Sequence, residues 1–181
     1  NLIMNFIETY KVDPKICDDL IDYFHDNTEY KKDGAVLDGK INKDVKDSID
    51  VHFYNDSNDL RIKNFFSSMK PCICEYVQKY RIAHAINTDL VNKIQYYKPK
   101  GGFKVVHYET SYETSTRVVV YMLYLNDVTD GGGTQFPFQN VTTLAKKGNL
   151  ILWPADFTHP HVGVVSNTQE KYISTGWFNY T

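Results

Sequence analysis

Two short stretches of the sequence contain side chains that could bind a metal ion. The stretch "FKVVHYET" places His107 and Glu109 two positions apart. Residues i and i+2 of a strand project from the same face, so an imidazole and a carboxylate can point together. The stretch "FTHPHVG" offers His159 and His161 as a third ligand. Two histidines and one carboxylate, with the other positions open, suit non-haem Fe(II) oxygen chemistry.

A cation follows this group at a fixed distance. Lys171 lies ten positions after His161 and begins the otherwise apolar stretch "KYISTGW". Such a lysine needs an anionic partner, because burying an unpaired charge costs free energy. A dicarboxylate cosubstrate would supply that anion.

Six motifs follow one another in the order and at the separations of a known family. They are "YYKPKGGFKVVHYE", "RVVVYMLYLND", "GGGTQFP", "GNLILWP", "HVG" and "KYISTGW". On these motifs the chain resembles the prolyl-4-hydroxylase-type Fe(II)/2-oxoglutarate dioxygenases. The resemblance covers residues 90–180 and extends more loosely to the first half. In its short, single-domain form the chain is similar to phage, viral and bacterial members.

The resemblance implies a set of metal ligands. His107, Glu109 and His161 would bind Fe(II). His161 is preferred to His159 because it has a glycine two positions on and Lys171 ten positions on, as the family pattern requires. His159 would then be a neighbour at the mouth of the site, either exposed or behind the ligands. Both histidines share a face on a regular strand, so their exchange stays open.

The resemblance also assigns residues to the cosubstrate. Lys171 would pair with the distal carboxylate of 2-oxoglutarate. Tyr97 and Tyr124 match positions whose hydroxyls reach that carboxylate in related enzymes, with Tyr96 as the alternative if the register slips by one. Thr175 lies on the same face of the last strand as Lys171 and is assigned to the same interior.

Two further residues are assigned to the substrate side of the pocket. Trp177 follows Thr175 by two positions and faces the same interior. Arg117 matches a substrate-side position of some relatives, and a solvated arginine at the end of a strand is the alternative.

One ligand departs from the family pattern. The usual motif is H-x-D, whereas this chain has Glu109. The extra methylene changes the reach or the denticity of the carboxylate. Other oxygenases of the superfamily use glutamate at this position, so we expect a competent site with an altered metal affinity or ion preference.

The activity that the resemblance implies is oxidative. Fe(II), 2-oxoglutarate and O₂ would be used, with ascorbate as reductant, to hydroxylate an aliphatic carbon and release succinate and CO₂. A prolyl residue of a protein or peptide is the first expectation, while a small molecule such as a free amino acid stays open. A cupin-like metal enzyme without 2-oxoglutarate would have no need of Lys171. A non-catalytic jelly-roll binding module is the third class.

The second half of the chain must provide the strands that position these residues. The stretches "VNKIQYY", "FKVVHYET", "RVVVYMLYLN", "NLILWP" and "KYISTGWFNY" are rich in β-branched and aromatic residues. We therefore expect an α+β fold in one domain, residues 1–181. Its catalytic core, residues 91–181, would be a double-stranded β-helix (jelly-roll or cupin-like), with N-terminal helices packed on it.

Residues 1–90 are predicted to form a helical support and a lid. Asp13 and Pro14 have the residue types of a helix start. Pro71 is expected to end or kink one helix, "SNDLRIKNFFSSM", before a second helix, "CICEYVQKYRIAHAI". Residues 30–53, which lie between the first helix and "SNDLRIKNFFSSM", are polar with weak periodicity, which predicts a long loop with short extended pieces, the possible lid.

The overall composition excludes several classes of protein. A net charge of −2 gives no electrostatic footprint for nucleic acid. No apolar run approaches the roughly 20 residues that span a bilayer, and the first residues lack the pattern of a signal peptide. Three cysteines, two of them in "PCICEY", form no disulfide framework or zinc motif. We expect reduced thiols and a cytoplasmic protein that binds neither nucleic acid nor membrane.

Overall fold

The structure is a computed structural model that describes residues 4–36 and 39–181. Leu37 and Asp38 belong to the segment predicted as a lid and lie outside the described residues. Within the described part of the chain, no helix is long and apolar enough to cross a membrane.

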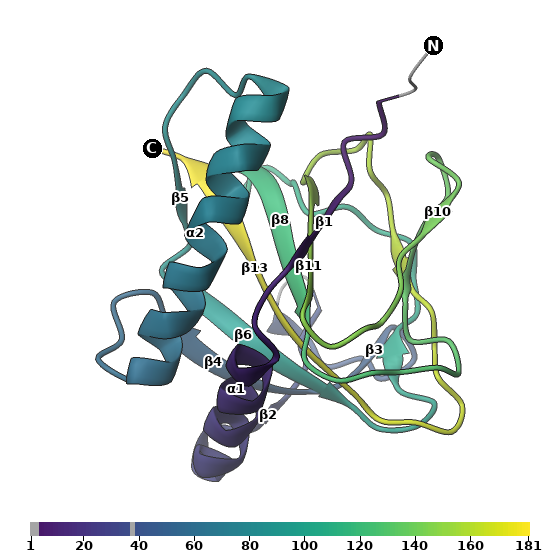
Figure 1. Ribbon diagram of the computed structural model, residues 1–181. Coiled ribbons are helices and arrows are strands. Elements are labelled where there is room, and N and C mark those ends of the chain that lie inside the picture. The colour runs from purple at the N-terminus through teal and green to yellow at the C-terminus, as the bar shows by residue number, and fades with distance from the viewer. Residues whose placement is uncertain (1–3, 37–38) are drawn as a thin grey trace.

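A large antiparallel sheet forms the frame of the molecule. Its strands, in spatial order, are β1 (Glu8–Lys11), β11 (Asn149–Pro154), β8 (Arg117–Tyr124), β13 (Lys171–Tyr180), β6 (Val91–Tyr97), β4 (Ile49–Tyr54) and β2 (Lys32–Asp33). The short strand β5 (Ile86–Thr88) pairs with the far end of β13. The longest strands, β8 and β13, lie side by side at the centre (Figure 1).

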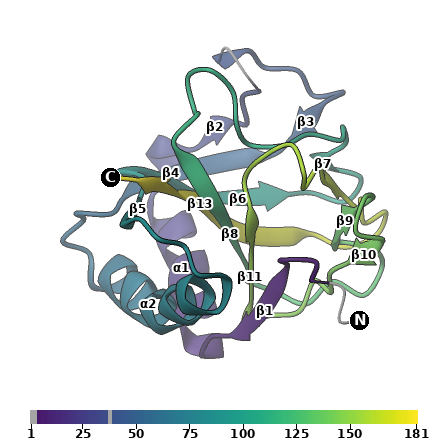
Figure 2. The same ribbon diagram turned by 90° about the horizontal axis from the view of Figure 1, so that it is seen from above.

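Two smaller sheets complete the fold. One consists of β10 (Val141–Thr142), β9 (Thr134–Phe136) and β12 (Val162–Gly163), and the other of β3 (Lys46–Asp47) and β7 (Gly102–Phe103). The helices lie on one side of the large sheet and β9 and β10 on the other (Figures 1 and 2). This sandwich of antiparallel sheets with packed N-terminal helices is the predicted α+β jelly-roll class.

Alternation along the central strands separates two environments. On β13, Tyr172 and Phe178 belong to the apolar core beneath the helices. The alternate residues of the strand, Lys171, Thr175 and Trp177 among them, line a cavity on the opposite face. This is the period of two that a strand imposes on its side chains.

The first helix, α1 (Pro14–Asp26), begins as predicted. The Asp13 side chain caps it by accepting a hydrogen bond from the Lys15 backbone N–H at 2.9 Å. Leu20 and Phe24 are fully buried beneath it. The 3₁₀-helix η1 (Thr28–Tyr30) follows directly.

The second helix corrects the prediction for Pro71. Instead of two helices there is one, α2 (Leu60–Tyr80), with Pro71 inside it. The buried stripe of Phe65, Met69 and Tyr76 continues on both sides of the proline. Packing of this stripe outweighs the single backbone hydrogen bond that a proline removes. The helix ends at Arg81, which adopts the left-handed conformation (φ 54°), so the predicted extension to residue 86 is wrong.

The first half is also less helical than predicted. It contributes β1 at one edge of the large sheet and β4 and β2 at the other. The predicted lid is a loop only in part, because its last residues form β4, which pairs with β6 over six positions. Ala35, Val36 and Val45, from the remainder of that segment, line the cavity.

Candidate metal centre

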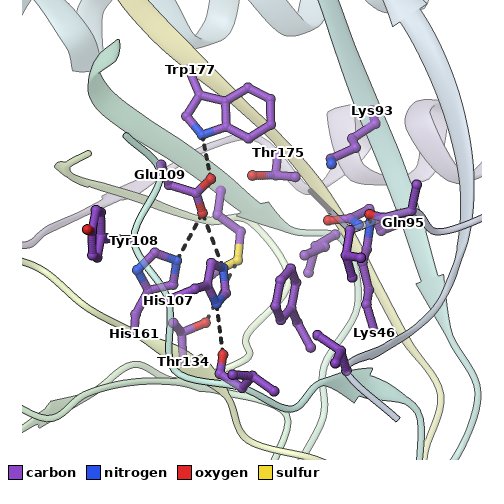
Figure 3. A pocket seen from close by; sticks show the side chains of 18 of the residues that line it. Lys46, Lys93, Gln95, His107, Tyr108, Glu109, Thr134, His161, Thr175 and Trp177 are labelled. Atoms are coloured by element: carbon purple, nitrogen blue, oxygen red, sulfur yellow. Dashed lines mark hydrogen bonds and ion pairs between the residues drawn. The ribbon is translucent and has the colours of Figure 1, made fainter. Parts of the chain in front are cut away.

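His107, Glu109 and His161 meet at one point on the cavity wall. Glu109 Oε1 lies 3.3 Å from His107 Nε2 and 3.2 Å from His161 Nε2. One ligand atom from each residue lies within 4.8 Å of the other two. Figure 3 shows the two imidazoles pointing at the same carboxylate. Two imidazoles and one carboxylate are a donor set that fits Fe(II).

The local backbone differs from the predicted strand. Of "FKVVHYET", only Phe103 belongs to a regular strand, β7 (Gly102–Phe103). Instead, His107 and His161 form an isolated bridge, with their backbones exchanging hydrogen bonds of 3.0 and 2.8 Å. The Glu109 N–H donates to the Ala155 carbonyl oxygen at 2.9 Å. Three backbone hydrogen bonds between distant segments of the chain therefore fix the ligands without a continuous β-sheet.

Backbone carbonyls determine the tautomer of both imidazoles. His107 Nδ1 lies 2.8 Å from the Val105 oxygen, and His161 Nδ1 lies 3.0 Å from the His159 oxygen. A carbonyl oxygen only accepts, so each Nδ1 must carry the proton. In the neutral imidazoles, both Nε2 lone pairs are then available toward Glu109. Metal-binding histidines are commonly oriented by such a carbonyl.

Aromatic rings enclose the imidazoles. Phe103 stacks on His107 with 3.8 Å between ring centroids. Trp153 packs edge-on against His161 at 5.0 Å, and Phe136 lies 5.6 Å from the same ring. These contacts limit the rotation of both ligands.

The second oxygen of Glu109 faces Trp177. The indole Nε1–H donates to Oε2 at 3.1 Å. Arg117 lies over the indole, 3.6 Å from the ring centroid, and 4.0 Å from Oε2. Burial raises the pKa of Glu109, but the neighbouring His107 and His161 side chains lower it more, and the pKa lies well below its usual range. Glu109 is therefore a carboxylate.

His159 does not face the metal centre. It is 4% exposed, so the expectation of a position at the mouth of the site is wrong. Its Nε2 lies 2.8 Å from the Asn5 carbonyl oxygen, and its Nδ1 lies 2.7 Å from Thr158 Oγ1. Both ring nitrogens thus have partners other than Glu109.

The cavity beside the metal centre has a volume of about 410 Å³ and contains Lys171. This lysine is 6% exposed. Its Nζ donates to the Gly132 carbonyl oxygen at 3.1 Å and lies 4.9 Å from the centre of the Tyr97 ring. Burial lowers its pKa to about 8. No carboxylate of the described residues pairs with it, which leaves its charge free for a ligand.

Glycine at position 163 keeps this end of the cavity open. A side-chain carbon there would lie 3.2 Å from the Phe103 carbonyl oxygen and 4.0 Å from Lys171 Nζ. The glycine two positions after His161 therefore allows β7 and Lys171 to approach closely.

The predicted cosubstrate tyrosines have different positions. Tyr97 lines the cavity opposite Lys171, its partner in the β6–β13 pairing. Tyr96 packs on the other side of the sheet, against Phe24 and Tyr172. Tyr124 does not reach the cavity.

The hydroxyl of Tyr124 is engaged elsewhere, 3.0 Å from Thr134 Oγ1 and 2.7 Å from Thr143 Oγ1. It lies behind Thr134, which itself lines the cavity. Thr175 lines the cavity too, but its hydroxyl donates to the Tyr121 carbonyl oxygen at 3.0 Å.

Several cavity residues were missed by the sequence reasoning. Lys46 and Gln95 line the cavity and bind the buried carboxylate of Asp50, with Lys46 Nζ at 2.8 Å. Lys93 lines the same wall. Lys93 and Gln95, at alternate positions of "VNKIQYY", were the available signal, because alternate residues of a strand share one face and can line one cavity together.

Comparison with known proteins gives a family match. Residues 92–179 match the family model described as the 2OG-Fe(II) oxygenase superfamily. The matched segment contains all three proposed metal ligands and Lys171.

Solved structures show the same fold. A viral collagen prolyl hydroxylase from Paramecium Bursaria Chlorella virus-1, in a 2OG complex, superposes with a TM-score of 0.73 at 18% identity. The alignment covers 98% of this chain and 97% of that one. A Trichoplax adhaerens prolyl hydroxylase, in complex with a hypoxia inducible factor peptide fragment, gives a TM-score of 0.80 at 14% identity, covering 98% and 84%. The predicted jelly-roll class is thereby confirmed.

A curated relative matches over a shorter span. The human prolyl 4-hydroxylase subunit alpha-1 is 26% identical over 73 residues. The match covers 36% of this chain and 14% of that protein. The chain thus spans a small part of the length of this relative.

Proposed function

We propose that this chain, whose residues 92–179 match the 2OG-Fe(II) oxygenase superfamily, hydroxylates an aliphatic carbon of a prolyl residue. The substrate would be a protein, a peptide or a small molecule that contains this ring. Fe(II), 2-oxoglutarate and O₂ are the cofactor and cosubstrates.

One observation carries the proposal: a preformed donor set lies in the same cavity as an unpaired ammonium. Two Nε2 lone pairs and the Glu109 carboxylate face one another. Lys171 supplies the cation for a dicarboxylate. A metal enzyme that lacks 2-oxoglutarate would not need this lysine, and a binding module would need neither feature.

Each residue has a defined task in this proposal. His107, Glu109 and His161 would hold the metal, with the Nδ1 protons bound to backbone carbonyls. Lys171, beside the Tyr97 ring, would orient the distal carboxylate of the cosubstrate. The aromatic walls exclude water from the reacting carbon.

The bound group supplies the chemistry itself. With O₂, Fe(II) and 2-oxoglutarate replace a substrate C–H bond by C–OH, while 2-oxoglutarate becomes succinate and CO₂. The protein contributes the ligand geometry, the cosubstrate orientation and a shielded cavity.

The peptide-binding neighbour supports the choice of substrate. The Trichoplax adhaerens prolyl hydroxylase, which shares the fold, is in complex with a peptide fragment. In this chain the cavity opens beside exposed aromatic and apolar residues, including Tyr108 and Val105. Such side chains suit contact with an apolar ring such as that of proline.

Succinate formation tests the proposal. The full chain with Fe(II), 2-oxoglutarate, O₂ and ascorbate should convert proline-containing peptides to products heavier by one oxygen atom. Succinate should form in equal amount. The same peptides with alanine in place of proline, and the His161→Ala variant, should give only background. Equal succinate from wild type and His161→Ala would overturn the proposal.

A further inference from the structure

Lys93 is a second unpaired cation in the cavity. Its backbone pairs with Thr175 in the β6–β13 ladder, and its Nζ lies 5.3 Å from the centre of the Trp177 ring. Figure 3 shows this nitrogen on the Thr175 side of the cavity. In residues 4–36 and 39–181, no carboxylate forms an ion pair with it and no oxygen accepts a hydrogen bond from it.

The carboxylate of Asp50 is close enough to influence Lys93 but is already engaged. It accepts hydrogen bonds from three donors: Lys46 Nζ at 2.8 Å, Ser48 Oγ at 2.7 Å and Gln95 Nε2 at 3.2 Å. The ion pair with Lys46 is almost fully buried. Asp50 therefore neutralises Lys46, and Lys93 is left without a counter-ion.

Two further carboxylates near Lys93, those of Glu109 and Asp89, are engaged as well. Glu109 faces the imidazoles through Oε1 and Trp177 through Oε2. Asp89 accepts from Asn179 Nδ2 at 2.6 Å and lies 3.8 Å from Arg117 Nε. Burial lowers the pKa of Lys93 to about 8, helped by the charge of Lys46, which is the behaviour of an ammonium without a partner.

Lys93 is separate from the cosubstrate cation. It lies opposite Thr175, four residues along β13 from Lys171. At about 3.3 Å per residue this places their backbones roughly 13 Å apart. Lys171 lies at the Gly163 end, whereas Lys93 lies at the end occupied by Trp177 and Arg117. One dicarboxylate that joins Lys171 to the metal centre leaves Lys93 free.

With Fe(II) and 2-oxoglutarate bound, the cavity would also contain one positive charge more than negative charges. Fe(II) is balanced by Glu109 and the 2-oxo acid end of the cosubstrate, and Lys171 by its distal carboxylate. Lys46 has Asp50. Arg117 has Asp89. Among the cations of the described residues that line the cavity, Lys93 alone lacks an anion, and an unpaired charge that is largely removed from water is costly.

We propose that Lys93 binds a carboxylate of the primary substrate, close to the carbon that is hydroxylated. This inference rests on the proposed function and makes it more specific. The carboxylate belongs either to a free amino acid or to an acidic side chain next to the target residue of a peptide. An ammonium–carboxylate hydrogen bond would orient the substrate against the metal centre.

Two matched pairs of probes test the proposal. The first is L-proline and L-prolinamide, and the second is a blocked Gly-Pro-Asp-Gly peptide and its Asn counterpart. Calorimetry would measure their binding to the anaerobic full chain with Fe(II) and 2-oxoglutarate. The variants are Lys93→Met, the charge-conserving Lys93→Arg, and Lys104→Met, which removes an exposed lysine that does not line the cavity.

We expect at least one acid to bind about tenfold or more tightly than its amide, because only the acid forms a charge-assisted hydrogen bond with the ammonium. Lys93→Met should abolish this difference, while Lys93→Arg and Lys104→Met should keep it. Preference for L-proline identifies a free amino acid, and preference for the Asp peptide identifies an acidic neighbour.

Equal binding of each acid and its amide, no binding at millimolar concentration, or a preference that survives Lys93→Met would overturn the assignment of Lys93. The visible band that Fe(II) and 2-oxoglutarate form together is the separate check on the protein. Its presence in wild type and variants shows that the site is folded and loaded. Its absence from wild type would refute the proposed function instead.

Discussion

Trp177 and Glu109 are joined by a hydrogen bond of 3.1 Å from the indole Nε1–H to the carboxylate oxygen Oε2. The other oxygen, Oε1, is the one that faces both imidazoles. The two oxygens of Glu109 thus have different partners. The side chain of glutamate, which is longer than the aspartate of the usual motif, is therefore fixed through both carboxylate oxygens. This arrangement favours a single oxygen toward the metal and makes Trp177 a positioning residue for that ligand.

Replacing Trp177 with phenylalanine should weaken metal binding. The ring would remain, but Oε2 would lose its donor, and outer partners of a ligand typically contribute 10–100-fold to metal affinity. We expect about a tenfold higher dissociation constant for Fe(II) or Co(II), measured anaerobically by equilibrium titration.

Trp153→Phe is the matched control for that variant. Trp153 packs on His161, but its indole N–H has no hydrogen-bond partner among the described residues. Its replacement should leave the metal affinity within about twofold, since no ligand loses a donor. Equal loss in both variants would show that the indole N–H of Trp177 has no special role.

The two histidines of "FTHPHVG" should behave differently. His161→Ala removes a proposed ligand and should lower metal affinity by at least about 100-fold, more than the loss of an outer partner. His159→Ala should leave metal affinity unchanged but lower the free energy of unfolding by about 1–3 kcal/mol, because the partly buried Asn5 carbonyl oxygen loses its donor and a buried ring is removed. Metal titration and urea unfolding distinguish these effects. Loss of metal by the His159 variant alone would reverse the assignment.

Lys171 should make cosubstrate binding depend on pH. Its pKa of about 8 means that the ammonium loses its proton as the pH rises through that value. Since only the charged form pairs with a carboxylate, the dissociation constant of 2-oxoglutarate should rise about tenfold per pH unit above 8. Lys171→Arg, which does not titrate in this range, should flatten the profile. The same slope in this variant would exclude Lys171 as its origin.

The same lysine should reduce stability in the absence of ligand. Burial lowers its pKa from 10.5 in the unfolded chain to about 8, so the unfolded chain binds more protons between these values. The free energy of unfolding therefore rises with pH across this window. At neutral pH the full penalty is present, and Lys171→Met should stabilise the ligand-free protein by on the order of 3 kcal/mol while abolishing 2-oxoglutarate binding. Lower stability of Lys171→Met at neutral pH would contradict this.

The buried pair of Lys46 and Asp50 should be sensitive to the loss of either partner. Burial raises the pKa of Asp50, but the charges of Lys46 and Lys93 and two hydrogen bonds outweigh it, so the pKa lies below its usual range. Stability from this carboxylate is present above pH 4 and is lost as the pH falls further. Asp50→Asn leaves a buried ammonium and should cost about 3–5 kcal/mol in urea unfolding. Asp33→Asn, at an exposed pair, should cost less than 1 kcal/mol.

Much of the fold could be predicted because the long central strands have a strong signal. The stretches at 91–97, 149–154 and 171–180 coincide with β6, β11 and β13, since each is dense in β-branched and aromatic residues. By contrast, β1 has the polar sequence "ETYK" and is stabilised by its pairing with β11. The residue types of β1 therefore do not predict its pairing with β11.

The candidate site was predictable where the family pattern sets a fixed sequence spacing between two residues. His161 and Lys171 are such a pair, and both reach the cavity wall. Tyr124 has the expected position in the chain, but Thr134 lies between it and the cavity, and only packing reveals this. Lys93 went unnoticed because a lysine in a strand usually indicates solvent, whereas β6 lies between β4 and β13.

The visible spectrum of the anaerobic protein tests the central claim most directly. The full chain would be mixed with Fe(II) and then titrated with 2-oxoglutarate. We predict a charge-transfer band that appears only when both are present and that is absent from His161→Ala. Metal binding without any band on addition of 2-oxoglutarate would contradict a 2-oxoglutarate-dependent centre at His107, Glu109 and His161.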